Sequence, residues 1–321
     1  MGQPDISTAR LTPTTKIERE GPMFKKILLA TSATPASDHA ARVAFNLAGN
    51  YNAELNLFHV LGVPSRGFSH VVVDVKTREK VDVDEEYLFG VTEEIKAYYA
   101  KYLENVPDYS IDVAVGLPAR EILRQAKALE PDLILLGGCT GDEDQSVYKK
   151  CAAGSTLHKV AKAAACPVMA VTRPAASFSG GMSNILFGTD FSKTSDKAFE
   201  YALTLAKNLG CGLHVFHALD ISGIQSGKLL DQDEIEQKIR ESLRMIQARY
   251  ESQLKELKNY SMDVWEGIPF IEIVKYARDK HADLIVMAHH SRRLPVEDSH
   301  LGSNVEQVIV RAGCPVLSVN K

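Results

Sequence analysis

Two segments of the chain have the residue types that could hold a phosphate group. The first, LGGCTGDEDQSVYKKCAAGST, covers residues 136–156, and the second, AHHSRRLPVEDSHLGSN, covers residues 288–304. Each follows an apolar run and ends in Gly-Ser before a helical pattern. Glycine lets backbone N–H groups turn towards phosphate oxygens without a Cβ in the way, and the start of a helix attracts anions. Both segments are therefore candidate phosphate-binding loops.

The first segment also contains residues that oppose phosphate binding. Asp142, Glu143 and Asp144 would repel a polyphosphate, although Lys149 and Lys150 could offset part of this charge. The segment is then either a nucleotide loop of reduced affinity or an ordinary strand-to-helix turn at the surface.

Residue types that bind metals occur in both segments. They are Cys139 and Cys151 in the first, and His289, His290, Glu297, Asp298 and His300 in the second. Zinc sites usually need four well-spaced ligands, and two adjacent histidines in an extended chain rarely face one ion. We expect no metal site in either segment.

Composition limits the remaining classes of protein. The 321 residues are 45% hydrophobic and 24% charged, with a net charge of −4 and no basic block, which argues against nucleic-acid binding. No apolar run approaches the roughly 20 residues that a membrane helix needs. Five cysteines without a CxxC pair indicate reduced thiols. Residues 1–23 lack the apolar core of a signal peptide, so we expect a flexible tail and a cytoplasmic protein.

The chain contains an internal repeat. Ile27 aligns with Ile185 and Phe58-His59 with Phe216-His217, always 158 residues apart. CPVMAV at 166–171 aligns with CPVLSV at 314–319. A segment rich in Pro, Gly and Ser, 173–183, separates the copies. The sequence therefore predicts two tandem domains, which we place at 24–175 and 176–321.

Within each copy, short apolar runs alternate with longer amphipathic segments. In the second copy, strands are predicted near 184–189, 212–218, 260–265, 283–288 and 315–319, and helices near 195–209, 231–258, 268–280 and 302–312. Strands without polar alternation favour a parallel sheet that helices cover on both faces. We predict an α/β fold with two doubly wound domains, each a five-stranded parallel sheet of order 3-2-1-4-5. Ligands of such sheets bind where the winding reverses, between strands one and four.

ILFGTDFSKTSDKAFEYALTLAKNL, LHVFHALD, DLIVMAHHS and LGSNVEQVIVRAGCPVLSV in the second copy resemble the universal stress protein family. The resemblance covers nearly the whole chain as two family domains. It implies a loop after strand four of the form G-x2-G-x9-G-[ST], an Asp after strand one, and adenine contacts from backbone at the end of strand two. It also implies an internal pseudo-dimer in which the last strands, 166–172 and 314–319, pair.

The second copy keeps part of this pattern. Its candidate nucleotide-binding residues are Thr189, Asp190, Ala218, Ala288, His290, Ser291, Gly302, Ser303 and Asn304. Ala288 and Ser291 replace the first two glycines, and ten residues rather than nine precede Gly302. Asp190 has an alternative interpretation as the N-cap of the helix that follows it.

The first copy departs from the pattern differently. Its candidate residues are Val60, Gly137, Gly138, Gly141, Gly154, Ser155 and Thr156. Either Thr31-Ser32 or Ser32-Ala33 stands where the family has its Asp, and twelve residues separate Gly141 from Gly154. The segment 68–86 has no counterpart in the second copy; it predicts a short β-hairpin, either a surface decoration or an arm that reaches the other copy or a second molecule.

The resemblance implies a stress-response regulatory protein that binds ATP, alone or with Mg²⁺, in at least one copy and acts through conformational change, a protein partner or a homodimer. The alternative is a scaffold with degenerate nucleotide loops. The sequence has no P-loop, no G-x-S-x-G elbow and no HExxH motif. We therefore expect no enzyme activity beyond slow ATP hydrolysis.

Overall fold

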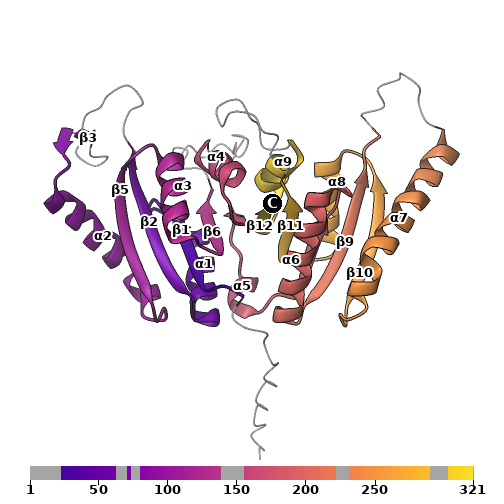
Figure 1. The fold of residues 1–321 in the computed structure, drawn as a ribbon, viewed down its shortest axis with the longest axis horizontal. Coiled ribbons are helices and arrows are strands. Elements are labelled where there is room, and N and C mark those ends of the chain that lie inside the picture. The colour runs from indigo at the N-terminus through magenta and orange to yellow at the C-terminus, as the bar shows by residue number, and fades with distance from the viewer. Residues whose placement is uncertain are drawn as a thin grey trace, which may run out of the picture.

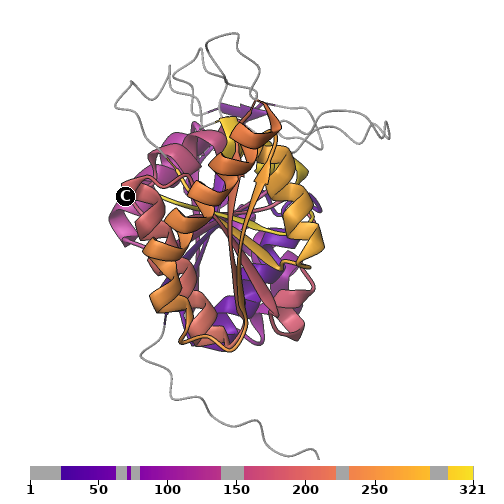
Figure 2. The same cartoon turned by 90° about the vertical axis from the view of Figure 1, so that its right-hand side faces the viewer.

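The computed structural model describes residues 23–62, 71–73, 80–138, 155–221, 231–289 and 303–320. Strands form one broad sheet, and helices lie on both of its faces (Figures 1 and 2). Residues 1–22 of the predicted tail, and most of the two candidate phosphate loops, lie outside the described residues.

The elements of the first half follow the predicted alternation. In chain order they are β1 (Lys26–Ala30), α1 (Asp38–Tyr51), β2 (Glu54–Gly62), β3 (Val71–Val73), β4 (Lys80–Asp82), α2 (Glu85–Leu103), β5 (Tyr109–Gly116), α3 (Pro118–Leu129), β6 (Leu133–Gly137), α4 (Ser155–Ala163) and β7 (Val168–Val171). β3 and β4 pair antiparallel as a separate two-stranded sheet within the segment that the second half lacks. We call this half domain 1.

A short helix, α5 (Ser177–Gly180), leads to domain 2. Its elements are β8 (Asn184–Gly188), α6 (Lys193–Leu209), β9 (Gly212–Leu219), α7 (Gln232–Leu254), β10 (Tyr260–Glu266), α8 (Pro269–Asp279), β11 (Leu284–Ala288), α9 (Ser303–Arg311) and β12 (Val316–Val319). α6 begins two residues before the prediction, because Ser192 caps it and accepts a hydrogen bond from Ser195 N. α7 ends at Leu254, four residues before the predicted 258.

The ten strands of the main sheet follow the order β10-β9-β8-β11-β12-β7-β6-β1-β2-β5. Numbered within each domain, both halves therefore have the order 3-2-1-4-5. All neighbours inside a domain are parallel. The α/β fold with two tandem domains is confirmed.

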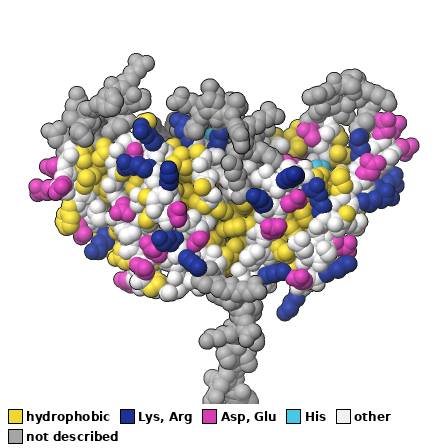
Figure 3. All heavy atoms as spheres, in the orientation of Figure 1, with side chains coloured by type: hydrophobic (Ala, Val, Ile, Leu, Met, Phe, Trp, Pro, Cys, Tyr) yellow, Lys and Arg dark blue, Asp and Glu magenta, His cyan; other side chains and the backbone are white. Residues whose placement is uncertain are grey.

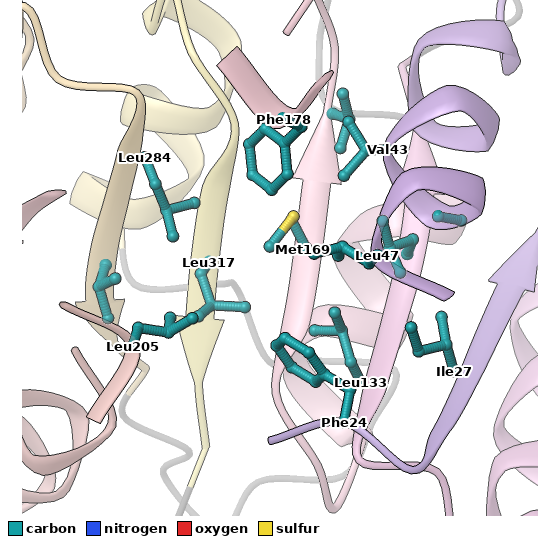
Figure 4. Packing of buried hydrophobic residues seen from close by; sticks show 14 of the residues in the cluster. Phe24, Ile27, Val43, Leu47, Leu133, Met169, Phe178, Leu205, Leu284 and Leu317 are labelled. Atoms are coloured by element: carbon teal, nitrogen blue, oxygen red, sulfur yellow. The ribbon is translucent and has the colours of Figure 1, made fainter. Parts of the chain in front are cut away.

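The two domains join through their last strands. β12 and β7 pair antiparallel, with Leu317 opposite Met169. Figure 4 shows these two side chains side by side at the seam, with Phe178 of α5 beside Met169. Asn320 Nδ2 also crosses the seam and donates to the carbonyls of Ala161 (2.7 Å) and Ala164 (3.0 Å) at the end of α4. The seam thus combines strand pairing, apolar packing and helix capping.

The core forms two layers, one on each face of the sheet, and each layer runs through both domains. Alternate residues of a strand enter opposite layers, as Leu28 and Leu29 of β1 do. Helices α1, α2, α6 and α7 cover one face, and α3, α4, α8 and α9 cover the other. This coverage explains why the central strands are apolar without alternation.

Candidate functional site

The end of the first strand is built in the same way in both domains. Thr189 N donates to Phe216 O (2.9 Å) beyond the end of β8, and Thr31 N donates to Phe58 O (3.0 Å) beyond the end of β1. His217 Nδ1 lies 2.8 Å from the carbonyl of Thr189, and the corresponding distance from His59 to Thr31 is 2.9 Å. Because a carbonyl only accepts, Nδ1 carries the proton in each imidazole. These contacts fix each strand end at the switch point.

Burial keeps these two imidazoles in the neutral form. It lowers the pKa of His59 and of His217 from the usual value. The bonded carbonyls oppose this shift only in part, and so does Asp190 in the case of His217. A neutral imidazole with its proton on Nδ1 serves as a fixed donor to the carbonyl of the preceding strand. The histidines at these positions therefore have a structural role in both domains.

A tyrosine on the second helix of each domain forms a hydrogen bond with the hydroxyl group of the same threonine. Tyr250 OH lies 3.2 Å from Thr189 Oγ1, and Tyr99 OH lies 2.8 Å from Thr31 Oγ1. Each threonine hydroxyl also accepts a backbone N–H two residues on, from Phe191 (3.1 Å) in domain 2 and from Ala33 (3.0 Å) in domain 1. The strand end thus passes into a tight turn whose shape is set by buried hydroxyl groups.

Asp190 occupies this turn in domain 2. It is exposed, and its Oδ1 accepts hydrogen bonds from Ser192 N (3.1 Å) and Ser195 Oγ (2.5 Å). Since Ser192 is the N-cap of α6, the interpretation of Asp190 as that cap is wrong. The turn instead presents a carboxylate at the carboxyl edge of the sheet, where open parallel sheets bind ligands.

Domain 1 has no carboxylate at this place. Ala33 N donates to Thr31 Oγ1 as Phe191 N donates to Thr189 Oγ1, and Ala33 and Phe191 both have a positive φ. Ser32 therefore corresponds to Asp190, which decides between the two alignments that the sequence left open. Ser32 Oγ lies 2.8 Å from Thr34 Oγ1 and donates to Ser37 Oγ at 3.3 Å. Its hydroxyl is therefore engaged inside the turn.

The residue that ends the fourth strand also differs between the domains. A Cβ on Gly137 would lie 2.9 Å from Ser37 Cα and 3.0 Å from Ala36 O, so this glycine lets the turn before α1 approach β6. Packing alone accounts for a glycine here, without a phosphate. A Cβ on Gly138 would be 3.5 Å from Thr172 Cα, an ordinary contact. In domain 2 the equivalent of Gly137 is Ala288, the last residue of β11.

The second strand supplies backbone groups to the same edge. Phe216 O bonds the residue after β8, so the alternation of β9 directs the N–H and C=O of Ala218 to the same side, past the end of β8. Leu219 faces the other way, because its carbonyl accepts from Gly267 N at 3.0 Å. Val60 has the equivalent place in β2, beyond the bond from Thr31 N to Phe58 O.

Several predicted site residues cannot be placed. Gly141, Gly154, His290, Ser291 and Gly302 lie outside the described residues. α4 begins at Ser155, next to Thr156, and α9 begins at Ser303, next to Asn304. Both helix starts therefore follow directly on the candidate loops, as the sequence predicts.

Other chemistry has little support in the described part of the chain. Among the residues that can be described, no group of three or more His, Cys, Asp or Glu could hold a metal ion, and no helix is long and apolar enough to cross a membrane. Cys166, Cys211 and Cys314 are free thiols. Burial raises the pKa of the Cys166 and Cys211 thiols to about 11 and that of Cys314 to about 12, so these thiols are protonated at neutral pH.

Comparison with known proteins identifies the family and agrees with the fold. The model of the universal stress protein family matches the chain twice, over residues 23–172 and 182–320. The chain belongs to the universal stress protein family. Universal stress protein YxiE of Bacillus subtilis is 32% identical over 159 residues, which cover 46% of this chain and 99% of that protein. Universal stress protein MJ0531 of Methanocaldococcus jannaschii is 30% identical over 142 residues, 43% of this chain and 81% of that protein.

A solved universal stress protein of Archaeoglobus fulgidus shares the fold over most of this chain. Its TM-score is 0.65 at 18% identity, and the match covers 93% of this chain and 97% of that one. Each of the two sequence relatives, in contrast, matches less than half of this universal stress protein. The likeness therefore extends to the tandem arrangement as well as to the single domain.

Sequence reasoning missed the residues that support the turn. Tyr99, Tyr250 and Arg249 come from α2 and α7, far from the candidate loops in sequence. A signal for the tyrosines exists: Tyr99 and Tyr250 are 151 residues apart, the same offset that relates the fourth strands. Extending the repeat alignment through the second helix would have found them. Arg249 has no such signal, because its counterpart is Tyr98.

Proposed function

We propose that this universal stress protein is a regulatory protein that binds adenine nucleotide, ATP with or without Mg²⁺, at the switch point of domain 2. Asp190 carries the proposal: it is an exposed carboxylate held by Ser192 and Ser195 at the carboxyl edge of the sheet. A carboxylate accepts strong hydrogen bonds from hydroxyl groups, which suits the ribose of a nucleoside.

The backbone of Ala218 suits the adenine base. One edge of adenine presents an amino donor beside a ring-nitrogen acceptor. The C=O and N–H of one residue, both directed past the end of β8, complement that pair. Backbone recognition of this kind places no demand on the side chain, so Ala218, and Val60 in domain 1, have no sequence signature.

The phosphates would reach the start of α9. That helix begins at Ser303, directly after Gly302, so its first N–H groups and dipole favour an anion there. Ser291 stands where the family pattern has its second glycine, and a side chain there costs about 1–2 kcal/mol where the bound loop needs a positive φ. Ala288 replaces the first glycine without this cost, because it ends β11 and its φ is not positive. We therefore expect moderate affinity, with Mg²⁺ bound through phosphate oxygens.

We assign no nucleotide to domain 1. Ser32 replaces the carboxylate, Gly137 has a packing role, and the loop that begins at Gly141 carries three acidic residues. These features favour a second function for this domain, that of a scaffold bound to domain 2 along β7 and β12. One nucleotide per chain follows.

The protein acts in this proposal by binding rather than by catalysis, with at most slow ATP hydrolysis. A change at the Asp190 turn would be read by a protein partner. On the face drawn in Figure 3, basic and acidic side chains are interspersed, so no continuous basic surface for nucleic acid is visible there. A cytoplasmic location, a homodimer and a protein partner stay predictions.

The test is to purify the protein without added nucleotide, denature it and identify released small molecules by mass spectrometry, and then to titrate ATP with Mg²⁺ by calorimetry. We expect micromolar binding, near −8 kcal/mol. Gly302→Asp should weaken it at least tenfold, because it places a carboxylate at the start of α9, whereas the matched change Gly154→Asp in domain 1 should not. No binding at millimolar ATP would leave only the scaffold function.

A further inference from the structure

The residue after Asp190 has an uncommon backbone conformation. Phe191 has φ 63°, in the left-handed region that a bulky residue rarely adopts. Its ring packs against the His217 ring, with centroids 4.4 Å apart. Asp190 Oδ1 accepts a hydrogen bond from Ser192 N, the residue after Phe191, so the turn at Phe191 brings the donor that holds the Asp190 carboxylate.

Arg249 of α7 holds this turn from the outside. Its Nη1 donates to the Phe191 carbonyl at 2.6 Å and lies 3.3 Å from Asp196 Oδ1. Its guanidinium carbon lies 5.9 Å from the centroid of the Phe191 ring. One side chain therefore contacts the backbone and the ring of Phe191 and links both to α6.

Domain 1 lacks this arrangement at equivalent positions. Tyr98 replaces Arg249 and Ala33 replaces Phe191, although Ala33 keeps the left-handed backbone at φ 50°. The Tyr98 hydroxyl donates to Asp38 Oδ1 at 3.1 Å, the counterpart of Asp196. The contact with the second helix is thus kept, and the contact with the turn is specific to the domain that has the carboxylate.

We propose that Arg249 is a positioning residue that holds the Asp190 carboxylate for a ribose hydroxyl and thereby gives domain 2 its selectivity for ribonucleotides. This inference rests on the proposed nucleotide site in domain 2. A carboxylate must lie within about 0.5 Å of its productive place to discriminate between ligands. Replacement of Arg249 should therefore lower the ratio of ribonucleotide to deoxyribonucleotide affinity, with little change in the free energy of unfolding.

The expected effect on stability is small, because the contact is partly solvated. The side chains of Arg249 and Asp196 are 42% and 44% exposed, and ion pairs in such places contribute little to the free energy of unfolding. A residue with only a structural role would change the melting temperature and all nucleotide affinities together. A positioning residue would change the ratio between ribose and deoxyribose ligands.

The experiment titrates ATP, 2′-deoxy-ATP and 3′-deoxy-ATP into the full chain and into Arg249→Met, Arg249→Lys and Tyr98→Phe. In the unmodified protein we expect at least tenfold weaker binding of one deoxy analogue. Arg249→Met should reduce this ratio to within about twofold, Arg249→Lys should restore part of it, and Tyr98→Phe in domain 1 should leave it unchanged.

The outcomes separate the inference from the proposed function. If the unmodified chain binds no ATP, the proposed function fails, and the inference fails with it. If that chain binds ATP and discriminates, but folded Arg249→Met keeps the full ratio, Arg249 is not a positioning residue and the nucleotide site stands. If Arg249→Met lowers the affinities for all three nucleotides in equal proportion, the inference is also overturned. The same holds if Arg249→Met unfolds and Arg249→Lys unfolds as well.

Discussion

Domains 1 and 2 share the frame of the switch point and differ in what that frame presents. Thr31 and Thr189 have the same partners, a buried tyrosine from the second helix and a half-buried histidine from the second strand. At the positions around these partners the domains differ: Ser32, Ala33 and Tyr98 in domain 1 correspond to Asp190, Phe191 and Arg249 in domain 2. The contacts that fold the strand end were kept after duplication, whereas the residues that would face a ligand diverged.

A second polar cluster also differs between the domains, but in a way that bears on stability rather than on ligand binding. In domain 2, His214 contacts Ser261 (2.8 Å), Ser261 contacts Tyr276 (2.9 Å), and Tyr276 donates to Asp263. At the equivalent positions of domain 1, Asn56, Ser110, Gln125 and Asp112 form a similar network. Both domains keep the serine and the aspartate of this cluster and differ at its other two positions, where Asn56 and Gln125 correspond to His214 and Tyr276, so this difference concerns stability.

The largest expected effect on stability comes from exchanging the residue at the end of the fourth strand. Gly137→Ala places a methyl group 2.9 Å from Ser37 Cα, and overpacking of this kind typically costs about 1–3 kcal/mol. The reverse change in domain 2, Ala288→Gly, should cost only about 0.5–1 kcal/mol through backbone entropy. Urea unfolding followed by circular dichroism checks both. Equal losses for the two variants would show that the strand ends do not differ as described.

This pair of residues also shows the limit of sequence reasoning about the site. Gly137 fits a phosphate-loop pattern in the sequence, but a Cβ there would meet Ser37 and Ala36, about a hundred residues earlier. A close long-range packing contact and a bound ligand both favour glycine. Only the structure, which places Ala36 and Ser37 against Gly137, distinguishes the two causes. The N-cap of α6 had the same ambiguity, because Asp190 and Ser192 are both good caps and the backbone decides for Ser192.

A smaller effect is expected from pH, because the second polar cluster contains a histidine, His214, in domain 2 and an asparagine, Asn56, in domain 1. Burial lowers the pKa of His214, and nearby Lys280 lowers it further, while Asp263 partly opposes the shift. The folded pKa then lies below the unfolded value of about 6.5, so unfolding takes up a proton as the pH falls below that value. The free energy of unfolding of domain 2 should therefore decrease on acidification.

His214→Asn, which introduces the residue of domain 1, should make this pH dependence shallower, by at most about 1.4 kcal/mol per pH unit. Trp265 reports on domain 2, because it is the single tryptophan of the chain and its ring lies 5.1 Å from that of Tyr276. Denaturant unfolding followed by tryptophan fluorescence between pH 7 and 5 (roughly the range below the unfolded pKa) measures the slope. An unchanged slope would mean that His214 is not the group that takes up the proton.

The fold itself was accessible from the sequence, for a physical reason. Strands such as LILLG and LIVMA are buried on both faces, and their apolar runs repeat in order, so periodicity and the internal repeat were enough to predict the sheet and the helices that cover it. The support of the site was accessible only in part: the internal repeat marks Tyr250, whereas Arg249, which reaches Phe191 from a helix some 60 positions later, has no counterpart in the repeat. Contacts of this length leave no local pattern.

The most direct test of the account is the number of ATP molecules bound per chain, measured by calorimetry with Asp190→Ala and its counterpart Ser32→Ala as a matched pair. Loss of a charged acceptor costs about 1.5–3 kcal/mol, so Asp190→Ala should weaken binding at least tenfold. We predict one site in the unmodified protein, one of unchanged affinity in Ser32→Ala, and one at least tenfold weaker in Asp190→Ala. Two sites per chain, or binding lost in Ser32→Ala and kept in Asp190→Ala, would contradict the assignment of the nucleotide to domain 2.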